Sequence, residues 1–397
     1  MVRWHLGFYP STVLEDAIVV AVVIYAWETY RGKLSVDWRS PFLWPTLLFV
    51  VAGAIAAVTA PSITAGLGLY RAYLLEPIAF ALVLVNVLRT PHRAMLVAGG
   101  LMAGAAVAGV ANSYVVLMGL IRHTYQVTQT PPVVIYLTAN AVALYVVPLV
   151  AVAGSLVLHA RQRERLFGGA FLVVGIVITV LSFSRGGYLA LAVVVAGLAI
   201  SHRRRFALLG LAALAVALLA LVPPIRTRVL IETENVYGNT VQSRIDLWNA
   251  AIKLIEHRPL TGAGLSGFQQ RVAPYLTNFH STAQFIDPHN IVLNFWVETG
   301  LLGLIAMAWI IGAGIVISWR GWRHGTPGWR PFHLGVLLAL VAVIVHGMVD
   351  VPYFKNDLSL EFWTLIALSW AGLRWPEPGQ ASERPAPPAA TLARSPS

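Results

Sequence analysis

The chain contains no cysteine, so disulfide bonds and thiolate metal sites are excluded. Charged residues are also scarce, at 11% of the 397 residues, against about 25% in typical soluble domains. Hydrophobic residues, by contrast, make up 57% of the chain. This balance is typical of an integral membrane protein rather than of a soluble domain.

Apolar runs long enough to cross a bilayer recur along the chain. In lipid only helices and closed barrels satisfy every backbone polar group, and these runs lack the alternating pattern of barrel strands. The sequence therefore predicts an all-α fold, a polytopic bundle of about 11–12 transmembrane helices. Gly300 and Gly303 are the expected break in the ninth span, which exceeds one straight crossing. The predicted spans cover residues 14–30, 42–60, 72–88, 94–111, 140–158, 166–183, 188–200, 206–222, 291–318, 334–349 and 360–373.

The net charge of +11 follows a membrane topology rather than a nucleic-acid site, so we expect no nucleic-acid partner. Arginines and lysines cluster in alternate short loops, which the positive-inside rule places in the cytoplasm. The same rule puts the C-terminus inside, and the N-terminus and the segment 223–290 outside. The basic loops contain Arg31, Lys33 and Arg39; Arg161, Arg163 and Arg165; Arg203, Arg204 and Arg205; and Arg320, Arg323 and Arg330.

Residues 1–375 are expected to form the membrane domain, with an outer loop at about 223–290 that is large enough to build a site. The remaining residues, 376–397, contain six prolines and almost no large apolar side chain, so we expect a disordered cytoplasmic tail. Within the loop, residues 241–257 have helical periodicity and predict a helix that lies along the membrane surface or caps the bundle. Its apolar stripe consists of Val241, Ile245, Trp248, Ile252 and Ile255.

Residues 262–267 have the glycine spacing of a dinucleotide-binding turn. That motif needs a buried strand before it and a helix after it, within a βαβ unit. Here it follows an amphipathic helix and Pro259. We therefore predict a flexible turn whose backbone passes close to a substrate, and no nicotinamide cofactor.

Two arginines are candidates for binding a negatively charged group at the outer face. Arg185 lies in a hinge between two apolar spans, where an arginine usually has a partner or a ligand because its insertion is costly. The alternative is an anchor that reaches toward lipid headgroups. Arg244, in the outer-loop helix, is expected to face the same spot. Two guanidinium groups suit a pyrophosphate because each donates paired hydrogen bonds.

His289 is the candidate catalytic residue, at the start of the ninth span. An imidazole with an ordinary pKa of about 6.5 accepts a proton from an attacking hydroxyl at neutral pH. Asp287 is expected to orient it, and Asn290 follows it directly. Asp350, at the outer end of the tenth span, either pairs with an arginine or binds acceptor hydroxyls. The alternatives are a capping or interfacial role for His289 and an ordinary helix-end carboxylate for Asp350.

Several short patterns together resemble the O-antigen ligase and O-antigen polymerase superfamily. The first is His289-Asn290, followed after nine residues by Gly300-x-x-Gly303. The resemblance covers roughly residues 130–370. The other patterns are Ser184-Arg185-Gly186-Gly187, Arg244-x-x-x-Trp248, Asp350 two residues before Pro352, and Asn140 near the start of a span.

The resemblance implies a glycosyltransferase of GT-C-like type in the bacterial inner membrane, inverting, independent of metal ions and without a cofactor. Such an enzyme takes a glycan from undecaprenyl pyrophosphate at the periplasmic face and moves it to an acceptor hydroxyl. That acceptor is lipid A core in the ligases and another glycan in the polymerases. The roles carried over make Arg185 and Arg244 the diphosphate clamp and His289 the activator or positioner of the acceptor. The remaining substrate-binding positions are Asp287, Asn290, Trp248 and Asp350.

A ligase is the first hypothesis, and a polysaccharide polymerase of the same superfamily is the second. A more remote alternative is a transporter for lipid-linked glycans. Transporters tend to have paired broken helices in two related halves. The sequence predicts one break, at Gly300, and no counterpart in the first half. A structural scaffold would leave Arg185, Arg244 and His289 without a role.

Overall fold

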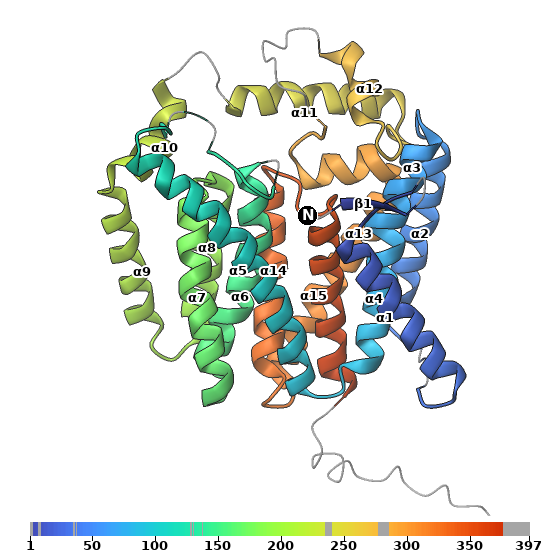
Figure 1. Ribbon diagram of the computed structural model, residues 1–397, viewed down its shortest axis with the longest axis horizontal. Coiled ribbons are helices and arrows are strands. Elements are labelled where there is room, and N and C mark those ends of the chain that lie inside the picture. The colour runs from blue at the N-terminus through green and yellow to red at the C-terminus, as the bar shows by residue number, and fades with distance from the viewer. Residues whose placement is uncertain are drawn as a thin grey trace, which may run out of the picture.

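The computed structural model describes residues 3–6, 9–34, 36, 38–127, 129, 131–136, 138–234, 240–276 and 286–375. The tail predicted at 376–397 lies outside these residues. The described chain is a helical bundle (Figure 1), so the all-α prediction is confirmed. A short antiparallel hairpin of β1 (Arg3–Leu6) and β2 (Tyr9–Thr12) precedes the first helix.

A helix lies over each of the eleven predicted spans because each apolar run is bounded by polar or helix-capping residues. The first, for example, begins with a capping box in which Thr12 and Glu15 satisfy each other's backbone N–H groups. These helices are α1 (Val13–Tyr30), α2 (Leu43–Val58), α3 (Ile63–Leu69) continued by the π-helical η1 (Tyr70–Leu75) and α4 (Glu76–Val87), α5 (Pro91–Ile121), α6 (Ala139–His159), α7 (Gln162–Leu181), α8 (Arg185–Ser201), α9 (Arg205–Ala220), α13 (Ile291–His324), α14 (Arg330–Gly347) and α15 (Asn356–Arg374).

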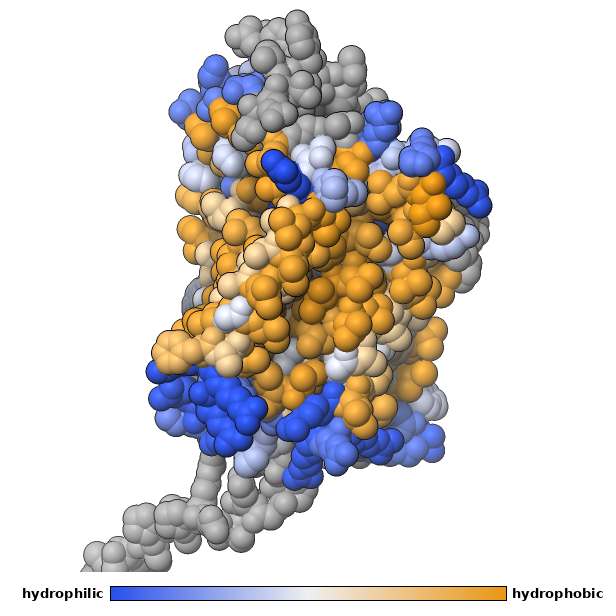
Figure 2. Space-filling model, turned by 90° about the vertical axis from the view of Figure 1, so that its left-hand side faces the viewer, coloured by the Kyte–Doolittle hydropathy of each residue, from blue (hydrophilic) through white to orange (hydrophobic). Residues whose placement is uncertain are grey.

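The chain is a multi-pass membrane protein. Among the described residues, six helical stretches are long and apolar enough to cross a bilayer, or seven if α9 and the start of α10 (Pro223–Glu234), which meet at 89°, form one bent span. The helices α2 and α8 are apolar but shorter. Figure 2 shows a broad belt of hydrophobic residues with hydrophilic residues gathered at both ends. The count of eleven spans stays a prediction.

The helices α6 and α14 lie at the centre of the bundle. About nine-tenths of the apolar window of α6 is buried and 78% of that of α14, against 28% for α7. Close packing of the two helices depends on Gly335, where a Cβ would lie 2.7 Å from the Cα of Val152. At the other end of α14, a hydrogen bond from Asn140 Nδ2 to Asp350 Oδ2 joins the same two helices.

The outer loop covers one end of the bundle with α10, α11 (Thr240–His257), α12 (Phe268–Val272) and the 3-10 turn η2 (Ala273–Tyr275) (Figure 1). The predicted amphipathic helix is present as α11, but its predicted stripe is only partly the packed face. Leu247, Ala251 and Leu254 are buried against α12 and α13, whereas Val241, Ile245 and Ile252 are exposed. The stripe predicted from the sequence is therefore rotated away from the packed face, which holds Leu247 and Leu254 together with Ala250 and Ala251.

The predicted break in α13 is present at Gly300, which has φ 69° and ψ −179°. A Cβ there would lie 2.1 Å from the carbonyl oxygen of Leu260. The outer loop docks at this point, since Leu301 N–H bonds Leu260 O and Ala263 N–H bonds Val297 O. Gly303 stays helical.

Candidate functional site

The turn that carries His289 is held in an unusual conformation. His289 has φ 49°, a left-handed value that costs energy for a residue with a side chain. Two flanking side chains hold the turn: Asp287 accepts the His289 backbone N–H at 3.0 Å, and Asn290 caps α13 by accepting from Val292 and Leu293. Asn290 also donates to Met348 O at 3.0 Å, which ties the turn to the end of α14.

The imidazole of His289 lies between two carboxylates. Its Nδ1 is 3.1 Å from Asp287 Oδ1 and 3.5 Å from Asp350 Oδ1. Asp350 is 5% exposed and accepts hydrogen bonds from Asn140 Nδ2 at 2.6 Å and from the Val351 backbone at 2.8 Å. Asp287 thus contacts the imidazole that it was expected to orient, and its orienting role stays a prediction. Asp350 pairs with His289, a partner that was not among its predicted alternatives.

These contacts shift both titrating groups. Burial alone would lower the pKa of His289, but the contact with Asp350 and the charges of Asp287 and Asp350 outweigh it and raise the pKa. Burial would raise the pKa of Asp350, but its contact with His289 and nearby positive charges hold it well below its usual range. The pair therefore favours a protonated imidazole beside an ionised carboxylate.

Arg185 begins α8 at the same end of the bundle. Ser184 caps the helix by accepting from Gly187 N–H, and Phe183 before it is left-handed with φ 51°. A Cβ on Gly186 would lie 2.6 Å from His346 and 2.9 Å from Val349. Arg185 is thus placed beside the end of α14, next to the turn of Asp350, at a helix N-terminus that favours anions.

The outer-loop helix α11 reaches the His289 turn through Trp248, whose Nε1 donates to Pro288 O at 2.9 Å. Arg244 lies one turn earlier on the same face. Its positive charge opposes protonation of His289 and so lowers the pKa of the imidazole, against the larger effect of the two carboxylates. The structure thus gathers Arg244, Trp248, Asp287, His289, Asn290 and Asp350 around one turn, with Arg185 beside the neighbouring end of α14.

The glycine-rich turn at 262–267 belongs to no βαβ unit, since it joins α11 to α12. Gly264 has φ 75°, and a Cβ there would lie 2.8 Å from Ala56 O of α2. Ser266 N–H donates to Glu298 Oε2 at 2.7 Å. The turn therefore brings backbone close to α2 and α13. In the described part of the chain, no three His, Asp or Glu side chains are grouped to hold a metal ion.

A pocket of about 220 Å³ adjoins the His289 turn, and Asp287 is part of its lining.

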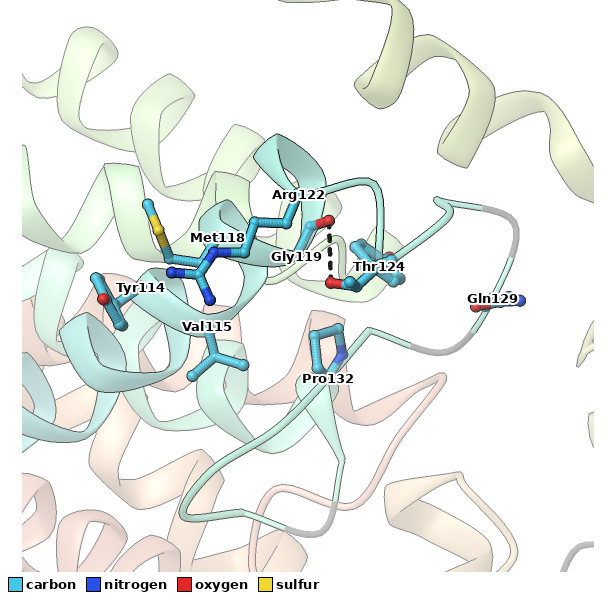
Figure 3. A pocket seen from close by; sticks show the side chains of 9 residues that line it. Tyr114, Val115, Met118, Gly119, Arg122, Thr124, Gln129 and Pro132 are labelled. Carbon is cyan, nitrogen blue, oxygen red and sulfur yellow. Dashed lines mark hydrogen bonds between the residues drawn. The ribbon is translucent and has the colours of Figure 1, made fainter.

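A larger cavity, of about 500 Å³, lies at the end of α5 that carries Ile121 and includes none of the predicted site residues. Figure 3 shows its lining, with Tyr114, Val115 and Met118 on α5, Arg122 directly after that helix, and Pro132 and Gln129 on the loop that follows. Arg228 of α10 links this loop to Arg185's turn by donating to the carbonyls of Gln129 and Phe183.

Comparison with known proteins supports the resemblance seen in the sequence. The protein family described as O-antigen ligase matches residues 170–308. This segment belongs to the O-antigen ligase superfamily. It includes Arg185, Arg244 and His289, whereas Asp350 lies beyond it. The predicted superfamily is confirmed.

A relative from Haemophilus influenzae (strain ATCC 51907 / DSM 11121 / KW20 / Rd), an uncharacterized protein, is 26% identical over 170 residues. The match covers 38% of this chain and 43% of the relative, so the chain spans less than half of that protein's length.

Two side chains that the sequence did not single out contribute to this region. Arg228 lies in a segment without helical periodicity, so it was not selected from the sequence. An arginine in the loop at 223–290 could still have been considered as a candidate for binding an anion. His346 packs against Gly186 with 2% exposure. A histidine near the end of an apolar span was a visible signal for it.

Proposed function

We propose that the chain is an O-antigen ligase-like glycosyltransferase. It transfers a glycan from undecaprenyl pyrophosphate to a hydroxyl of lipid A core at the periplasmic face of the inner membrane. The observation that supports this most is His289, held in a left-handed turn between Asp287 and Asp350 with Arg244 nearby. Strain of this kind persists where the surrounding structure fixes a side chain for a task.

The proposed reaction needs one proton acceptor. The acceptor hydroxyl loses its proton to the neutral form of His289, and its oxygen attacks the anomeric carbon of the donor glycan. The bond between that carbon and the pyrophosphate oxygen breaks, and undecaprenyl pyrophosphate leaves with the electron pair. Attack from the face opposite the leaving group inverts the configuration. Asp350 stabilises the imidazolium that forms.

The charged residues near the His289 turn include two arginines that suit a diphosphate leaving group. Arg185, at the N-terminus of α8, and Arg244 of α11 bring positive charge to the leaving diphosphate. Preorganised donors of this kind stabilise charge that develops in the transition state. Arginine also binds phosphate oxygens with paired hydrogen bonds, so the two side chains clamp the donor in one orientation.

The test is transfer by purified protein in detergent or nanodiscs, from an undecaprenyl-pyrophosphate-linked oligosaccharide to lipid A core. We expect one addition per acceptor molecule, and its loss in His289→Ala. Asp246→Ala on α11, away from the turn, is the matched control and should transfer normally. A ladder of products on a glycan acceptor would support the polymerase instead. Transfer by His289→Ala at the wild-type rate would remove the imidazole from the mechanism.

A further inference from the structure

The pocket of about 220 Å³ beside the His289 turn has a polar, buried floor. Asn294 and Glu298, one turn apart on α13, are 1% and 5% exposed and both line it. Asp287, which contacts His289, lines it as well. The opening is bordered by Gln269, which is exposed.

Asn294 lacks a partner for its side chain. Neither its Nδ2 nor its Oδ1 has a hydrogen-bond partner among the described residues, although both atoms are buried. Leaving a buried amide unpaired costs free energy, and such groups in folded proteins are nearly always satisfied. An amide that faces a pocket without a protein partner is therefore placed to bind what enters the pocket.

The chemistry of the walls indicates the kind of ligand. Tyr73 and Phe354 form an edge-to-face pair with ring centroids 6.4 Å apart, and both line the pocket. Asp287 and Glu298 supply carboxylate oxygens, and Asn294 supplies one donor group and one acceptor. Aromatic faces beside carboxylates and amides suit a sugar ring, which has apolar C–H faces and a rim of hydroxyls. The carboxylate of Asp287 and the absence of an arginine or lysine among the described lining residues disfavour a pyrophosphate.

We propose that this pocket binds a sugar ring of the acceptor, and that Asn294 determines specificity by hydrogen bonding to its hydroxyls. The inference rests on the proposed function. Asp287 connects the two parts: it lines the pocket and contacts Nδ1 of His289, so a ring bound there lies next to the imidazole. Neither Arg185 nor Arg244 lines this pocket, so the diphosphate that they would bind lies outside it.

The experiment compares Asn294→Leu with the wild type. Leucine has a similar volume and no polar atoms, so replacing an unpaired amide should leave the melting temperature unchanged or higher. The KM for the acceptor should rise at least tenfold, equivalent to about 1.4 kcal/mol. The KM for the lipid-linked donor should change less than twofold. Unchanged acceptor KM, or a rise confined to the donor, would overturn the proposal.

Asn112→Leu is the matched control. Asn112 is a buried asparagine of α5 at 2% exposure, but its Oδ1 accepts the Val134 N–H, and it lies outside the pocket. Its replacement should lower the melting temperature because the hydrogen bond that joins α5 to Val134 is lost, and should leave the acceptor KM unchanged. A rise in acceptor KM equal to that of Asn294→Leu would show a general packing effect and overturn the proposal.

A binding measurement separates the pocket from the transfer reaction. Methyl glycosides of glucose, galactose and glucosamine are titrated without donor, and protein fluorescence reports binding. We expect at least one to bind wild type and Arg185→Ala alike, and to bind Asn294→Leu at least tenfold more weakly. Binding that is equal in Asn294→Leu, or absent in wild type, would overturn the pocket proposal. Binding without any glycan transfer would leave the pocket supported and the proposed function wrong.

Discussion

At the scale of single residues, the pairing of His289 with Asp350 has a direct kinetic consequence. His289 must be neutral to accept a proton, and its pKa is raised by the two carboxylates against the opposing effect of burial. Transfer should therefore increase with pH through that raised pKa. Asp350→Asn removes one carboxylate, so the pKa of His289 should fall and the acidic limb of the profile should move to lower pH.

The profile of kcat/KM against pH measures this directly, because it reports groups in the free enzyme. The matched control is Asp246→Asn, since Asp246 is a carboxylate of α11 that bonds Gln242. It should leave the limb in place. If the acidic limb of the pH profile is unchanged in Asp350→Asn, or moves to higher pH, then Asp350 does not raise the pKa of His289 as proposed.

Arg185 should contribute mainly through charge and the paired geometry of its guanidinium. Removal of one preorganised electrostatic donor lowers kcat by about 10²–10³ in other enzymes. We expect Arg185→Ala to show a loss of this order, with Arg185→Lys recovering only part of it. The readout is kcat/KM for the lipid-linked donor. Arg122→Ala removes an arginine from the separate cavity at the end of α5 and should change this kcat/KM less than threefold. An equal loss in Arg122→Ala would indicate an effect of bulk surface charge.

At the scale of elements, the break in α13 couples the outer loop to the site. Alanine at position 300 would have to adopt φ 69° with ψ −179°, a region that only glycine readily occupies, at about 1–3 kcal/mol, and would meet the Leu260 carbonyl. We expect Gly300→Ala to lower the melting temperature and transfer together, since the loop that carries α11 docks there. Gly312→Ala, in the same helix with open space at its Cβ, should be neutral or slightly stabilising.

Helices and turns could be predicted from the sequence where a short stretch of residues carries the pattern. Apolar runs indicated the helices, and paired glycines indicated the break at Gly300. The turn of His289 was found because a histidine beside Asp287 and Asn290 is unusual at the start of an apolar helix. Local pattern could not show that Asp350 would meet His289, or that Ala250 and Ala251 would lie on the packed face of α11. Those contacts depend on how distant helices pack, as does the unpaired amide of Asn294.

At the scale of the whole molecule, a hydrophobic belt separates two hydrophilic ends (Figure 2), and the arginine clusters lie at one of them. The connections from α6 to α7 and from α8 to α9, together with the first turns of α7 and α9, contain arginine clusters and lie at the end opposite α11 (Figure 1). The positive-inside rule predicts that this end faces the cytoplasm, and therefore that the His289 turn faces the other compartment. A lipid-linked glycan presented at the outer face would then reach Arg185 and Arg244 without crossing the bilayer.

The orientation is testable because the chain has no cysteine of its own. Lys253→Cys, on an exposed position of α11, and Arg163→Cys, in the first turn of α7, each remove one positive charge at opposite ends. In intact spheroplasts a membrane-impermeant maleimide should label Lys253→Cys and leave Arg163→Cys unlabelled until the membrane is opened. The reverse pattern would place the arginine pair and His289 on the cytoplasmic side, where a periplasmic acceptor could not reach them.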